Sequence, residues 1–216
     1  MSKDTVYFEL LEFMNEDVCP VCALIEKRVK NSMDSFLFEC VNDPAVRKTI
    51  NSSGGLCDYH SEMLLQMGDP LAHAIIYHGL IENALKNIKK DNFEQYRSHS
   101  DCKYCKMVGE FEEMYTKAFV AGFAKEDFAK KYTNGGMLCM AHLDMIKELC
   151  GKKRRKSSVY AQILDVTKNK YNVLLEQLSE IQRKSDYRFT HEKWIEDEIK
   201  AWKRAVGVIN DKTGKR

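Results

Sequence analysis

Two stretches in the first half of this chain, CPVC at residues 19–22 and GGLCDYH at residues 54–60, return in altered form in the second half. The later versions are CKYC at residues 102–105 and GGMLCMAH at residues 135–142. Each half therefore holds a Cys-x-x-Cys pair, followed further along by paired glycines and a Cys-x-x-His pair. This repeated order of residue types is the feature from which fold and chemistry are predicted.

The repeat extends beyond these motifs to residues of other types. Phe36 and Phe119 are separated by 83 residues, as are Cys19 and Cys102, whereas His60 and His142 are separated by 82. A shared offset among unlike residues indicates one unit of about 83 residues used twice. We predict one globular domain with an internal duplication, made of a first copy at 19–101, a second copy at 102–185, and a C-terminal covering helix and tail at 186–216.

Three thiols and one imidazole per copy, arranged as two close pairs, are the ligands of a tetrahedral Cys3His metal site. A spacing of three places cysteine and histidine on the same side of a first helical turn, and a helix N-terminus favours thiolates. The paired glycines permit positive φ and a close backbone approach to the sulfurs. We predict one site within each copy: Cys19, Cys22, Cys57 and His60 in the first, and Cys102, Cys105, Cys139 and His142 in the second.

The ligand set favours two zinc ions, because a closed shell of soft sulfur and one imidazole suits a structural ion without redox chemistry. Iron, alone or as an iron–sulfur cluster in which histidine replaces a cysteine, is the alternative. Of the eight cysteines, Cys40 and Cys150 fall outside the motifs. Both lie among apolar neighbours at helical spacing, so we expect them in the core.

Long segments carry apolar residues at spacings of three and four, and the whole chain has only three prolines. These features predict an all-α protein, a helical bundle built from two tandem copies of a four-helix metal-binding unit plus an N-terminal and a C-terminal helix. Asp43-Pro44 and Asp69-Pro70 are the cap-plus-proline signals of helix starts. The final helix, at about 190–206, has its large apolar residues near one face, which we expect to pack inward: Trp194, Ile195, Ile199, Trp202 and Val206.

The charge balance, 34 basic against 32 acidic residues, argues against a global field for nucleic acid or membrane. No apolar run is long enough for a membrane helix, and the first 15 residues lack the core of a signal peptide. We therefore expect a cytoplasmic protein, in which cysteines serve metal or redox chemistry rather than disulfides. The basic run Lys152–Lys156 could hold phosphate, but a solvated loop between helices is the favoured interpretation.

No catalytic set is recognised, since the chain lacks a Ser/His/Asp arrangement and a phosphate-gripping glycine loop. His73 and Tyr77 lie one turn apart after Asp69, with His78 and Glu82 as a second pair. Such a stripe can supply an acid and a base, but a capped helix with a satisfied histidine is the favoured interpretation. We assign no catalytic residue and do not favour an enzyme.

The chain resembles an uncharacterised family of small prokaryotic proteins, a domain of unknown function. The resemblance covers nearly the whole chain and is carried by residues 19–24, 54–60, 68–73, the second Cys/His set and residues 185–189. It implies the family's motifs but no activity.

The leading hypothesis is a cytoplasmic structural or interaction module with two zinc sites and a protein partner. The first alternative is a redox-responsive or metal-responsive protein that uses the thiol sites or an iron–sulfur cluster. The second, weaker alternative is nucleic-acid binding through Lys152–Lys156.

Overall fold

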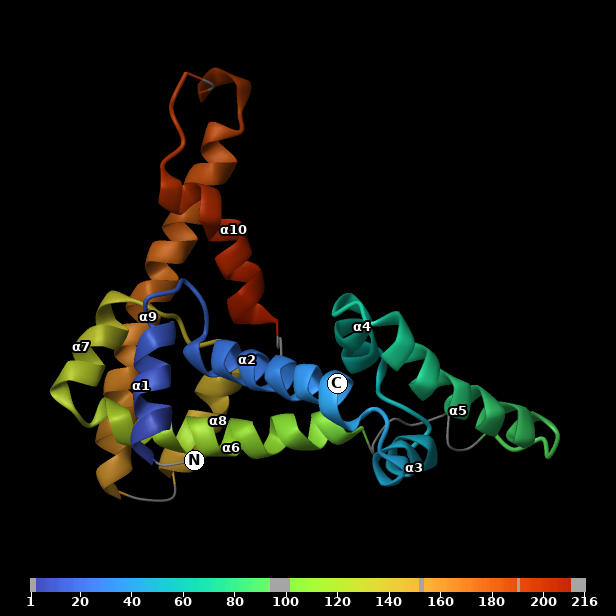
Figure 1. Cartoon of the computed structure of the whole chain (residues 1–216). Helices are drawn as coiled ribbons and strands as arrows, with labels where there is room; N and C mark the ends of the chain where they lie inside the picture. The colour runs from blue at the N-terminus through green and yellow to red at the C-terminus, as the bar shows by residue number, and fades with distance from the viewer. Residues whose placement is uncertain (1–2, 94–101, 152–153, 190, 211–216) are drawn as a thin grey trace. The chain divides into compact units, whose positions relative to one another are not determined.

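The computed structural model describes residues 3–93, 102–151, 154–189 and 191–210, which form α-helices and contain no strand (Figure 1). The predicted all-α class is confirmed. None of the described helices is both long and apolar enough to cross a membrane. A π-helical turn at Phe36–Cys40 and a 3-10 turn at Tyr187–Phe189 accompany the helices. The helices are α1 (Lys3–Phe13), α2 (Pro20–Ser35), α3 (Pro44–Ser52), α4 (Asp58–Gln66), α5 (Pro70–Ile88), α6 (Lys103–Phe123), α7 (Glu126–Asn134), α8 (Met140–Gly151), α9 (Arg154–Lys184) and α10 (Glu196–Ile209).

Two helix starts follow the predicted cap-plus-proline signal. The Asp43 carboxylate accepts a hydrogen bond from the Ala45 amide at 2.7 Å, and Pro44 is the first residue of α3. Likewise, the Asp69 carboxylate accepts from the Ala72 amide at 2.9 Å at the start of α5. A cap of this kind satisfies an amide that the helix leaves free, and proline has no amide to satisfy.

The described chain divides into two compact units that do not follow the order of the two motif copies. Unit 1 contains residues 3–24 and 112–210, and unit 2 contains residues 25–111. Consequently α2 begins in unit 1 and continues in unit 2, whereas α6 begins in unit 2 and continues in unit 1. Each of these long helices therefore belongs to both units.

Unit 1 has an aromatic core between α6 and α7. Phe119 is fully buried and makes edge-to-face contacts with Phe128 and Tyr132, at ring-centroid distances of 5.3 and 5.2 Å. The Tyr132 hydroxyl is bonded to the hydroxyl of Thr167 on α9 at 2.7 Å. This geometry is the favoured arrangement of aromatic pairs, and the buried hydroxyl has its partner.

Unit 2 has an aliphatic core along α2, and α5 packs against α3 beside it. Ile25, Val29 and Met33 are almost completely buried. Gly79 of α5 lies against the side chain of Asn51 of α3, where a Cβ atom would come within 2.6 Å of the amide nitrogen. Close packing of α3 on α5 therefore depends on this glycine.

The prediction of which face of the C-terminal helix packs inward is wrong. Trp202 is 55% exposed and Ile199 54% exposed, while a neighbouring face of α10 buries Ala201 and Val208 beside Leu174 of α9. Small alanine side chains let α10 approach α9 closely, and the helix gains its polar contacts with α9 on the same side. The large apolar face, expected to pack inward, is left outside.

Two other predictions concern the segment before α9. The solvated loop expected at the basic run does not include its last three residues, because α9 begins at Arg154. The side chains of the basic run Lys152–Lys156 lie outside the described residues.

Candidate metal centres

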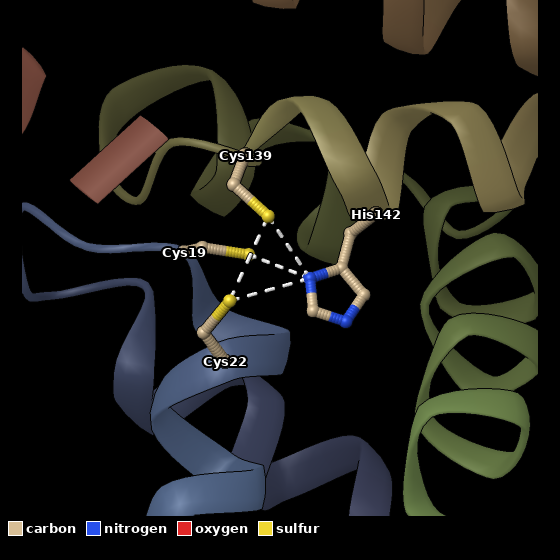
Figure 2. Close-up of side chains that lie close together, drawn as sticks. All are labelled: Cys19, Cys22, Cys139 and His142. Atoms are coloured by element: carbon tan, nitrogen blue, oxygen red, sulfur yellow. Dashed lines mark hydrogen bonds between the residues drawn. The ribbon is translucent and has the colours of Figure 1, made fainter. Parts of the chain in front are cut away.

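Candidate site 1 joins the start of α2 to the start of α8. The Nδ1 atom of His142 lies 3.5 Å from the sulfur of Cys19, 3.3 Å from that of Cys22 and 3.1 Å from that of Cys139 (Figure 2). The sulfurs of Cys22 and Cys139 are 3.6 Å apart, and all four side chains are buried. Cys19 and Cys139 immediately precede their helices, whereas Cys22 and His142 lie in the first turns.

Candidate site 2 repeats this arrangement at the starts of α4 and α6. The Nδ1 atom of His60 lies 3.1 Å from the sulfur of Cys57, 3.7 Å from that of Cys102 and 3.4 Å from that of Cys105. The Cys57 and Cys105 sulfurs are 3.5 Å apart. Unlike their counterparts in site 1, Cys57 and Cys105 are only half-buried. Site 2 is therefore the more accessible of the two.

The predicted pairing within each copy is wrong. The Cys-x-x-Cys pair of the first copy meets the Cys-x-x-His pair of the second copy in site 1, and the remaining pairs meet in site 2. Helix α2 accounts for this, because it continues to Ser35 and carries the chain about 20 Å away from Cys22 before the next motif of the same copy begins. Each site nevertheless lies within one unit, site 1 in unit 1 and site 2 in unit 2.

The spacing of the ligand atoms fits one tetrahedral ion at each site. Bonds of about 2.3 Å to sulfur and about 2.0 Å to nitrogen place sulfurs about 3.8 Å from one another and about 3.5 Å from the nitrogen. The observed separations in both sites, 3.5–3.6 Å between sulfurs and 3.1–3.7 Å between sulfur and nitrogen, come close to these values. The four ligands could therefore share one ion without rearrangement.

The histidines also favour a bound cation. His60 and His142 are completely buried, and the Nε2 atom of each has no hydrogen-bond partner among the described residues. Burial of a polar ring with one nitrogen unpaired costs free energy, so a strong bond at the other nitrogen is required. A metal–nitrogen bond at Nδ1 provides it.

The thiols show opposed pKa shifts within each site. Burial disfavours the thiolate of Cys19, but hydrogen bonds with Cys139 and Cys22 outweigh it and hold the pKa of Cys19 well below its usual value. A hydrogen bond with Cys139 raises the pKa of Cys22. In site 2, burial again opposes ionisation, but hydrogen bonding to His60 lowers the pKa of Cys102 to about 6, whereas burial raises that of Cys105. In each site one thiol thus ionises more readily than a neighbouring one, and a divalent cation would reduce the repulsion between neighbouring thiolates.

Backbone contacts hold the glycine loop of the second copy against the Cys-x-x-Cys pair of the first. The Met137 amide donates to the Val18 carbonyl at 2.9 Å. At Gly135 a Cβ atom would lie 2.0 Å from the Met14 carbonyl oxygen, so the two backbones touch. The close approach predicted for the paired glycines is therefore to the backbone around Met14. Gly136, with φ of 64°, provides the predicted positive φ.

Two residues of α9 that the sequence analysis did not single out support this loop. The ammonium group of Lys170 donates to the carbonyls of Tyr132, Gly135 and Gly136, the last two at 2.8 and 2.7 Å. The Tyr171 hydroxyl donates to the Leu138 carbonyl at 2.9 Å, next to Cys139. Burial lowers the pKa of Lys170 to about 8. A lysine at helical spacing gives no sequence signal for such a role.

The residues proposed for acid–base chemistry form a simpler structure. The ring of His73 bonds through Nδ1 to the Asp69 carbonyl at 2.6 Å and stacks on Tyr77. His78 and Glu82 form an exposed pair at 3.8 Å. The capped helix of the favoured interpretation is present, but the histidine is only partly satisfied, because its buried Nε2 atom has no hydrogen-bond partner among the described residues.

Comparison with known proteins agrees with these motifs. A family model described as "Family of unknown function (DUF6062)" matches residues 1–100 and again residues 93–215. The double match confirms the internal repeat. An "Uncharacterized 23.9 kDa protein in xynA 3'region" from Caldicellulosiruptor sp. (strain Rt8B.4) is 33% identical over 204 residues, which are 93% of this chain and 98% of that protein. No solved structure matches. The chain belongs to this family of unknown function.

Proposed function

We propose that the protein binds two zinc ions and that both are structural. The observation that carries the proposal is the ligand set, three sulfurs and one imidazole nitrogen at tetrahedral spacing, which occurs twice. Four protein ligands close the coordination shell and leave no position for a substrate, as is typical of structural zinc. Soft sulfur ligands select zinc over magnesium, calcium or manganese.

Each ion would fix the start of one long helix to the start of another. In site 1 these are α2 and α8, and in site 2 they are α6 and α4. The free amides and positive dipole of the helix starts stabilise thiolates, so the ion and the helices support the same charge state. Each zinc ion would thereby join two helix starts, in addition to the hydrophobic contacts that these helices make along their length.

The role proposed for this scaffold is that of an interaction module in the cytoplasm with a protein partner. Large apolar side chains exposed on α5 and α10 support this role, because exposed apolar stripes mark sites of protein interaction. Reduced cysteines in both sites suit a reducing compartment.

Elemental analysis of protein purified under nitrogen, combined with a visible spectrum, tests the proposal. We expect about two zinc ions per chain and no colour. Iron with a brown chromophore would refute the zinc proposal and support the iron–sulfur alternative. Absence of both metals at any stoichiometry would refute metal binding altogether.

A second candidate function, redox response, is favoured by the exposure of site 2. The half-buried sulfurs of Cys57 and Cys105 lie 3.5 Å apart. Hydrogen peroxide would oxidise these two thiolates to one disulfide and take up two protons to give two waters, releasing the ion. We expect limited peroxide to release one zinc ion per chain and a thiol reductant to permit rebinding. Equal release from both sites, or none before unfolding, would contradict this function.

A further inference from the structure

Helix α10 carries a continuous apolar seam on an exposed face. Its members are exposed by between 52% and 65% and follow one another at spacings of four, three, four and three: Ile195, Ile199, Trp202, Val206 and Ile209. This spacing is the a/d pattern of a helix that packs against another helix. Within the described residues of unit 1, a neighbouring face of α10, which holds Ala201, Ala205 and Val208, meets α9, and α10 has a smaller contact with α8.

The polar contacts that α10 makes with α9 and with Asp17 hold it firmly in place. Lys184 of α9 bonds both carboxylate oxygens of Glu198 at 2.7 Å, and both side chains are nearly buried. Arg204 donates to Gln177 at 2.8 Å and to Asp17 at 3.0 Å. Because α10 is already folded and anchored, a partner would bind the seam without paying for helix formation.

The charges beside the seam suit a second copy of α10 in antiparallel orientation. Glu196 and Lys203 lie on the same flank, seven residues apart, with Glu196 near the start of the helix and Lys203 nearer its end. Antiparallel pairing about a two-fold axis would place each Glu196 beside Lys203 of the second copy, which makes two equivalent ion pairs. Glu196 pairs with Lys200 of its own helix at the surface, and an exposed pair of this kind can exchange for Lys203 of the second copy at little cost. In a parallel pair Lys203 would face Glu198, which Lys184 holds in a nearly buried pair.

The exposed area is sufficient for a dimer of moderate affinity. Five large side chains, each a little more than half exposed, offer roughly 600 Å² per chain, or about 1,200 Å² for two copies before the polar rim is added. This value lies at the lower end of specific interfaces. Trp202 lies at the middle of the seam, where aromatic anchors contribute most.

We propose that the protein forms a two-fold symmetric dimer through antiparallel packing of α10 seams, with Ile199 and Trp202 beside the two-fold axis and one Glu196–Lys203 pair on each side of it. This inference rests on the interaction role proposed above and names the partner as a second copy of the chain.

Sedimentation of the full-length protein across about 1–100 µM tests the dimer, since interfaces of this size give affinities in that range or tighter. We expect a mass that approaches twice the 25.1 kDa of one chain as the concentration rises. Trp202→Glu should leave the protein monomeric throughout. Leu175→Glu, a control at an equally exposed leucine of α9 outside the seam, should leave dimerisation unchanged.

A charge exchange tests the orientation without removing apolar area. Glu196→Lys or Lys203→Glu alone places like charges together and should weaken the dimer about tenfold, whereas the double exchange should restore it. A monomer at the highest concentration, or a dimer indifferent to Trp202→Glu and to the charge exchange, would overturn the proposal. Zinc content measured on the same samples separates this result from failure of the zinc sites.

Discussion

Replacement of Gly135 by alanine is expected to damage site 1 through a backbone clash rather than through any ligand. The backbone at Gly135 is extended, with φ of −158°, so alanine meets no conformational barrier there. The added Cβ atom, however, would lie 2.0 Å from the Met14 carbonyl oxygen. Met14 is fully buried, and the glycine loop is held by Lys170, so neither side has room to move freely.

The size of the effect follows from the displacement that the clash demands. The two atoms must separate by more than about 1 Å to reach an ordinary contact, and overpacking of this kind costs about 3 kcal/mol, or about a hundredfold in the folding equilibrium. The movement would also stretch the hydrogen bond from Met137 to Val18, which joins the glycine loop to the Cys-x-x-Cys pair. We therefore expect a weaker affinity for the ion of site 1 and an unchanged affinity for that of site 2.

Urea unfolding followed by circular dichroism, with zinc release followed by a chromogenic chelator, measures both effects. Gly151→Ala is the matched control, because this glycine at the end of α8 has no atom within 4 Å of its added Cβ. The control should be unchanged or more stable by up to about 1 kcal/mol, since alanine is the better helix former. If Gly135→Ala unfolded at the same urea concentration as the parent and kept both ions equally tightly, the contact between the glycine loop and Met14 would be refuted.

Three further predictions concern the sites and the α9–α10 pair. The double variant Cys22→Ser/Cys139→Ser should retain one zinc ion per chain and Cys22→Ser/Cys57→Ser none, whereas pairing within each copy requires the reverse in elemental analysis. Lys170→Met should lower the free energy of unfolding by about 2 kcal/mol, because buried carbonyls lose their donor; an unchanged urea midpoint would contradict its supporting role. The hydrogen bond from Lys184 holds the pKa of Glu198 below its usual value, so this pair stabilises fully above pH of about 4.3 and is lost as the pH falls further. In Glu198→Gln the melting temperature should accordingly fall less steeply with decreasing pH than in the parent protein. The same fall in both proteins would show that other groups cause the loss of stability in acid.

Local signals predicted the helices well because each depends on residues near in sequence. The Asp43 and Asp69 caps lie where the cap-plus-proline pattern placed them. The eight cysteine and histidine residues that the structure gathers into two groups were likewise singled out by their spacing within helical turns. The spacing does not show which Cys-x-x-Cys pair lies beside which Cys-x-x-His pair.

The pairing of motifs depends on where long helices carry the chain. Two copies with identical ligand types offer the same local chemistry for pairing within a copy and between copies. The length of α2 and the packing of Gly135 against Met14 decide between them, and both are tertiary features. The direction of α10 was missed for a similar reason, since a seam of large apolar residues looks like a core face until the smaller Ala201 face is seen packed on α9.

The exchange of ligands between the copies has a consequence for a polypeptide that carries one copy. A polypeptide carrying one copy would hold four candidate ligands, yet a long helix and a short one would separate its Cys-x-x-Cys pair from its Cys-x-x-His pair. Two such polypeptides could form two complete four-residue sites if the Cys-x-x-His pair of each combined with the Cys-x-x-Cys pair of the other, as in a domain-swapped homodimer. In the present chain the two copies are covalently linked, so this exchange of motif pairs does not depend on an association equilibrium between separate subunits.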